Sequence, residues 1–163
     1  MFEKIVLRIF FCGGLISIPL LLFRKPPIKD WIIVFLFTGI ISGIIDMVLV
    51  SKNYLSYPKR LFPKKFQIHF LFDYIMCPVV SVAYNQWTYK DKSFRVFLKL
   101  FPFTIFHMLL EVLAERYTKL IRWKKGWKWY HTYFSMTLKY FIVRISIYFI
   151  RKVSKQQESY SSK

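Results

Sequence analysis

Cysteines, acidic residues and catalytic motifs are scarce or absent in this chain of 163 residues. Its two cysteines, Cys12 and Cys77, lie within apolar runs, which argues against a disulfide scaffold and against a zinc site with cysteine ligands. The chain has no P-loop, no dinucleotide-binding fingerprint, no serine-nucleophile motif and no HExxH pair. The sequence therefore assigns no catalytic residue.

Acidic residues number only eight against 26 lysines and arginines, which gives a formal net charge of +18. Most of the basic residues lie in short segments between apolar runs or in the C-terminal tail, and no nucleic-acid-binding motif accompanies them. We therefore expect them to contact the anionic head groups of a lipid bilayer, and we expect no nucleic-acid partner. A membrane-protein partner and a homo-oligomer are both left open.

Long apolar runs dominate the rest of the chain, which is 55% hydrophobic and 21% aromatic. So much apolar surface does not fit into the core of one small soluble domain. The runs predict an all-α, polytopic membrane helix bundle, with one domain over residues 1–150 and a disordered, polar, basic tail over 151–163. Five transmembrane helices are expected, at residues 5–23, 31–50, 66–87, 94–115 and 127–150. If the first run does not cross the membrane, four remain.

Ionisable side chains inside these apolar segments are the main functional signal, because such groups are costly in a bilayer and rarely face lipid. His107, Glu111 and Glu115 are spaced by four residues and so share one face of the fourth helix. A similar polar stripe on the third helix starts with His69 and Asp73, ahead of the kink expected at Pro78.

Depth along the helices places most of these groups at one end of the bundle, the end that holds the N-terminus. On the second helix, Gly39 and Gly43 predict a face for close helix packing, and Asp46 lies on the same side. We therefore predict a shared buried polar cluster: Arg8, Asp46, Asp73, His107, Glu111, Glu115 and His131. A slight excess of lysine and arginine at this end predicts that it is cytoplasmic.

Three interpretations of the cluster follow. The favoured one is a non-enzymatic membrane protein with an accessory, ligand-binding or assembly role, in which the cluster is structural or binds a small ligand. The second is a metal-dependent membrane enzyme, because His69, Asp73, His107 and Glu111 are two helical pairs that could ligate a divalent metal. The sequence suggests no other cofactor. The third is a proton-linked carrier, since acids and histidines in membranes often relay protons.

Four segments resemble a known family: residues 23–31 (FRKPPIKDW), 71–74 (LFDY), 85–89 (NQWTY) and 125–130 (KGWKWY). Together they resemble an uncharacterised family of small multi-pass membrane proteins from spore-forming Gram-positive bacteria. The resemblance covers nearly the whole chain and implies a bacterial plasma membrane and a link to sporulation. It implies no activity and no catalytic residue.

Overall fold

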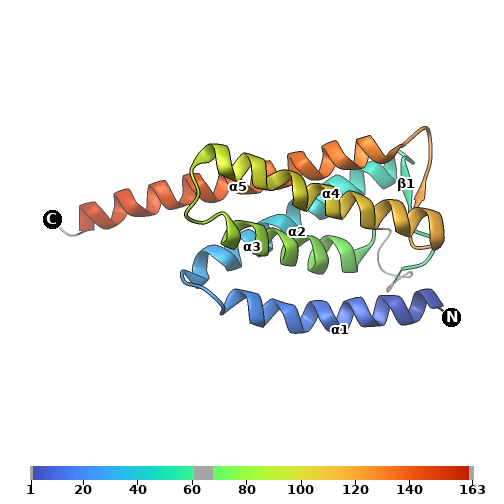
Figure 1. The fold of residues 1–163 in the computed structure, drawn as a ribbon, viewed down its shortest axis with the longest axis horizontal. Coiled ribbons are helices and arrows are strands. Elements are labelled where there is room, and N and C mark those ends of the chain that lie inside the picture. The colour runs from blue at the N-terminus through green and yellow to red at the C-terminus, as the bar shows by residue number, and fades with distance from the viewer. Residues whose placement is uncertain (1, 61–67, 162–163) are drawn as a thin grey trace.

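The computed structural model describes residues 2–60 and 68–161, and it is a bundle of helices that run alternately up and down (Figure 1). The all-α fold predicted from the apolar runs is confirmed. The elements, in chain order, are α1 (Phe2–Leu22), α2 (Ile28–Ser51), β1 (Leu55–Ser56), η1 (Phe72–Met76), α3 (Cys77–Trp87), α4 (Ser93–Tyr117), β2 (Arg122–Trp123) and α5 (Trp129–Ser161).

A two-stranded antiparallel sheet closes the end of the bundle at which α1 begins (Figure 1). Leu55 pairs with Trp123 and Ser56 with Arg122, so the segment after α2 is hydrogen-bonded to the segment after α4. These two segments therefore lie at the same end, as the alternating direction of the helices requires. We call this the sheet end, and the other, from which the last turns of α5 project, the open end.

By length and composition, four helices of the described residues can cross a membrane: α1, α2, α4 and α5. Of the five predicted helices, the third is the one outside this group. The predicted alternative with four spans excludes the first helix instead. Large apolar side chains are exposed along the bundle, among them Ile9, Leu36, Phe106 and Phe134. A soluble monomer rarely exposes so much apolar surface, so the chain is a membrane protein.

The third helix differs most from its prediction. It opens with the π-helical turn η1 before α3, while its predicted start at residue 66 lies outside the described residues. Pro78 explains the wider turn, because it has no N–H to donate to the carbonyl of Tyr74 and its ring would crowd that carbonyl in a regular α-helix. The irregularity expected at Pro78 is thus a π-helical turn.

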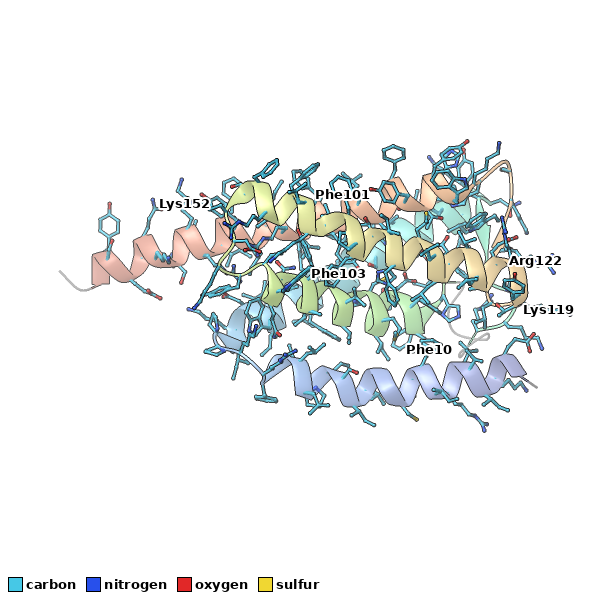
Figure 2. All side chains as sticks on the ribbon, viewed as in Figure 1. Phe10, Phe101, Phe103, Lys119, Arg122 and Lys152 are labelled. Carbon is cyan, nitrogen blue, oxygen red and sulfur yellow. The ribbon has the colours of Figure 1, made fainter. Side chains whose placement is uncertain are left out.

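The tail after residue 150 also differs from its prediction. Residues 151–161 continue α5 as a helix where disorder was expected. Lysine, glutamine and glutamate are good helix formers, and Glu158 forms an ion pair with Lys29 at 3.8 Å. At ~1.5 Å per residue α5 is ~50 Å long, so it extends beyond a hydrocarbon layer of ~30 Å. Lys152 lies on the projecting part (Figure 2).

Small residues bring the first three helices close together. A Cβ atom built on Gly43 would overlap the ring of Tyr74, and one built on Gly14 would overlap Ile75. Gly39 also contacts Tyr74, so the small-residue face predicted on α2 packs against η1. The close contact positions Asp73, which neighbours Tyr74 in the sequence, beside the C-terminal half of α2.

Candidate functional site

A buried cavity of about 50 Å³ lies inside the bundle near the sheet end. Its polar lining comes from six parts of the chain: α2, the segment after β1, the residues leading into η1, η1 itself, α3 and α4. That volume has room for a small ion or a few water molecules. The lining residues with polar side chains are Asp46, Tyr57, His69, Asp73, Cys77, His107 and Glu111.

Two carboxyl groups and a tyrosine meet on one side of the cavity. Asp46 of α2 accepts a hydrogen bond from the hydroxyl of Tyr57, and its carboxyl group is close enough to that of Asp73 for the two to interact electrostatically. Tyr57 is buried, and its ring packs edge-on against His69 at a centroid distance of 5.5 Å. The segment after β1 thus covers the cavity and supplies a donor to a buried acid.

Burial raises the pKa of the Tyr57 hydroxyl well above its usual range, and the nearby carboxylates, Asp46 first, raise it further. The hydroxyl therefore keeps its proton and stays a donor.

We expect Tyr57→Phe to lower the free energy of unfolding in detergent by about 1.5 kcal/mol, because Asp46 loses a hydrogen bond inside the protein. Tyr54→Phe is the matched control, since no hydrogen bond of its hydroxyl is found among the described residues; an equal loss in both would contradict the assignment.

Glu111 is held by hydrogen bonds from side chains at the sheet end. Its Oε1 atom accepts hydrogen bonds from Nε1 of Trp123 at 3.0 Å and from Oγ1 of Thr132 at 2.7 Å. Thr132 in turn accepts one from Nε1 of Trp127 at 2.9 Å. Trp123 directly, and Trp127 through Thr132, thus orient the Glu111 carboxyl group.

His107 also lines the cavity and is held by two protein partners. Its Nδ1 atom is 2.6 Å from the hydroxyl of Tyr140, and its Nε2 atom is 3.9 Å from Sγ of Cys77. Tyr140 belongs to α5 and Cys77 to α3, so this histidine links three helices. Its ring is occupied by protein partners on both nitrogen atoms.

His69 and Asp73 are different, because both are buried and several of their polar atoms have no partner. His69 is 1% exposed, and among the described residues neither its Nδ1 nor its Nε2 has a hydrogen-bond partner; Oδ2 of Asp73 has none there either. Buried polar groups are nearly always hydrogen-bonded, and leaving one unpaired costs about 1–3 kcal/mol. These three atoms therefore indicate a place where the cavity can accept a further partner.

Lys139 of α5 is the cation that belongs to the cluster. It is only 3% exposed, and it lies close enough to Asp46, Asp73 and Glu111 to interact with all three electrostatically. It forms no ion pair at contact distance with any described residue. One ammonium group thus faces three carboxyl groups, which leaves the cluster with an excess of acid.

The structure brings together four members of the predicted cluster, Asp46, Asp73, His107 and Glu111, and adds His69. The other three do not line the cavity: Arg8 is exposed, Glu115 is half-buried, and the ring of His131 stacks on Trp127 at 5.1 Å. The sequence also suggests Lys139 as a cation near these acids, whereas Tyr57 and Tyr140 are not part of the predicted cluster. A lysine in the middle of an apolar span is itself a signal of a buried partner, whereas nothing in the sequence marks either tyrosine.

A preformed metal centre is not found at the predicted positions. The pairs His69–Asp73 and His107–Glu111 do line the same cavity. Yet in residues 2–60 and 68–161 no three histidine, cysteine, aspartate or glutamate side chains are arranged to hold a metal ion. His107 and Glu111 are turned to protein partners, so metal binding by all four residues requires side chains to rotate.

Comparisons with protein-family models, with curated proteins and with solved structures find no match. The resemblance to a family from spore-forming bacteria, and the bacterial plasma membrane that it implies, therefore stay predictions. The geometry of the cavity is therefore the evidence on function.

Proposed function

We propose that the protein is a non-enzymatic integral membrane protein whose buried cavity binds a small cation. The observation that carries the proposal is the set of unpaired atoms on His69 and Asp73, both of which line the cavity. An imidazole nitrogen and a carboxylate oxygen are acceptors for an ammonium proton and ligands for a metal ion.

Charge favours a cation over a neutral or anionic ligand. The cavity is lined by three carboxyl groups, with Lys139 as the buried cation near them. A bound positive charge would reduce the repulsion among the carboxylates and pair the free oxygen of Asp73. The small volume sets the size, because about 50 Å³ admits an ammonium or metal ion but not a bulky amine.

The test is thermal unfolding of the full chain in detergent at constant ionic strength, with ammonium, methylammonium, sodium, zinc or manganese as the added cation. Choline serves as the cation that is too large for the cavity. At least one small cation should raise the unfolding temperature of the wild type, as expected for a ligand that binds only the folded state. His69→Gln should abolish that shift, while His131→Gln, outside the cavity, should retain it.

The outcomes also separate the alternatives. A shift with zinc or manganese alone would support the metal interpretation, and it should then vanish in Glu111→Gln as well. Failure of every small cation to exceed choline would contradict the proposal and leave the cluster with a structural role. A proton-linked carrier would need pH-dependent flux in proteoliposomes that Glu111→Gln abolishes.

A further inference from the structure

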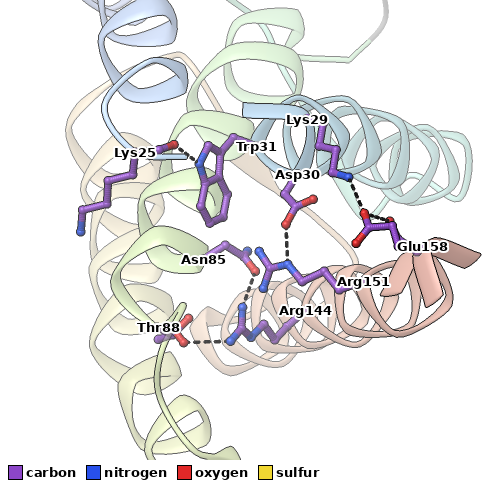
Figure 3. Close-up of polar contacts among 10 residues, drawn as sticks. Lys25, Lys29, Asp30, Trp31, Asn85, Thr88, Arg144, Arg151 and Glu158 are labelled. Carbon is purple, nitrogen blue, oxygen red and sulfur yellow. Dashed lines mark hydrogen bonds and ion pairs between the residues drawn. The ribbon is translucent and has the colours of Figure 1, made fainter. Parts of the chain in front are cut away.

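A second polar cluster occupies the open end of the bundle, away from the cavity (Figure 3). Arg151 of α5 donates from Nε to Oδ2 of Asp30 at the start of α2, at 2.6 Å. Its guanidinium group also lies over the rings of Tyr89, at 4.6 Å, and Trp31, at 5.4 Å. These contacts hold Arg151 in one place, between α2 and the turn that leads to α4.

Arg144, about two turns earlier on α5, is held by hydrogen bonds to neutral groups, and the carboxylate of Asp91 is near enough to attract it electrostatically. It donates to Oδ1 of Asn85 at 3.1 Å and to the carbonyl of Thr88 at 2.9 Å, and both acceptors are neutral (Figure 3). The guanidinium groups of Arg144 and Arg151 are near enough to repel each other. Nη2 of Arg151 is buried and has no hydrogen-bond partner in the part of the chain that the structure describes. Two arginines held in place, one of them hydrogen-bonded to neutral acceptors, are suited to bind an anion.

Arg144 and Arg151 line an open cleft of about 780 Å³, which is within the usual size range of a small-molecule site. Five lysines and arginines line it: Lys29, Arg144, Arg151, Lys152 and Lys155. Its three acids already have partners, because Asp30 pairs with Arg151, Asp91 with Lys99 outside the cleft, and Glu158 with Lys29. Arg144, Lys152 and Lys155 therefore stay available to a ligand.

The cleft is also amphipathic, and its place matches a membrane surface. Ile33, Tyr148 and Ile150 form an apolar part of its lining, while Lys152 and Lys155 lie farther along α5. Phe149 and Ile32, nearby on α5 and α2, are exposed, as expected of residues that face lipid. α2 starts and α3 ends at this level, so the cleft opens where apolar spans give way to water (Figure 1).

We propose that this cleft binds the phosphate of an anionic phospholipid. The head group lies against Arg144, Arg151 and the two lysines, and the acyl chains follow the apolar side of α5. A free phosphate ion shares the head-group chemistry but lacks the chains that the apolar lining accommodates. This site is separate from the cation cavity, and its test does not depend on the proposed function.

The experiment measures binding of phosphatidylglycerol, phosphatidylcholine and glycerol phosphate to the detergent-solubilised full chain by native mass spectrometry. We expect phosphatidylglycerol to bind at least about tenfold more tightly than phosphatidylcholine, whose choline group cancels the charge of the phosphate. Lys152→Gln with Lys155→Gln should weaken phosphatidylglycerol binding about 25-fold, or about fivefold for each lysine. Both lysines are exposed, so the variant should fold.

The matched control is Lys4→Gln with Lys128→Gln, which removes the same charge from exposed positions at the sheet end. This variant should bind phosphatidylglycerol as the wild type does. Equal weakening in both double variants would mean that the attraction is diffuse and would overturn the site. Equal binding of the two lipids by the wild type, or full competition by glycerol phosphate at equal concentration, would also overturn it.

Discussion

Replacement of Lys139 by methionine is expected to lower the free energy of unfolding by about 4 kcal/mol at neutral pH, the largest effect predicted for this chain. Lys139 is buried beside Asp46, Asp73 and Glu111, and no lysine or arginine of the described residues lines their cavity. Methionine keeps the length and apolar character of the side chain while it removes the charge. The loss should therefore come from three carboxyl groups that no longer have a cation nearby.

Two further measurements separate this electrostatic cause from a packing defect. The deficit of Lys139→Met should shrink as the pH falls, because protonated carboxyl groups no longer need a cation. Asp46→Asn should restore part of the lost stability in the double variant, since it removes one of the repelling charges. Equilibrium unfolding in mixed detergent micelles gives the free energies.

Lys99→Met is the control for loss of a lysine from a span. Lys99 forms an ion pair with Asp91 at 2.6 Å near the open end, where its side chain is 28% exposed, so its removal should cost only about 1 kcal/mol. A variant at Lys139 that is as stable as the wild type at pH 7 would show that the cluster does not depend on this cation.

Gly43→Ala should lower the free energy of unfolding by about 2.5 kcal/mol, as overpacking of a tight contact does. The new Cβ atom would lie 2.8 Å from Cζ of Tyr74 and would also overlap its hydroxyl. Tyr74 is stacked on Phe70 with ring centroids 5.1 Å apart, so the ring cannot move without loss of another contact. Separation of α2 from η1 would also move Asp46 away from Asp73.

The control for this substitution is Gly13→Ala, because a Cβ atom there has no neighbour within 4 Å. Alanine also has the higher helix propensity, so Gly13→Ala should be neutral or slightly stabilising. Tyr74→Phe should relieve part of the Gly43→Ala defect, since it removes the overlapping hydroxyl. If Gly43→Ala and Gly13→Ala have the same stability, the close approach of α2 and η1 is not needed for folding.

Hydrophobic runs and their spacing were enough to predict the helices and the end at which polar groups gather. The apolar runs identified five helices, and the alternation of direction placed Asp46, Asp73, His107 and Glu111 at one depth. Both inferences are local, because residue spacing determines the face and the depth of a side chain on its own helix. They hold whatever the neighbouring helix does.

Which groups meet was decided by the tertiary structure. Arg8 and Lys139 both lie on predicted spans, yet Arg8 is exposed and Lys139 is buried among the acids. Each helix can rotate about its axis, and only packing against its neighbours selects one orientation. Tyr57 reaches Asp46 because the strands β1 and β2 pair, a contact between segments far apart in the sequence. The sequence alone thus determined a membrane bundle with polar groups at a common depth, and packing decided that an unpaired His69 and Asp73 would face a cavity.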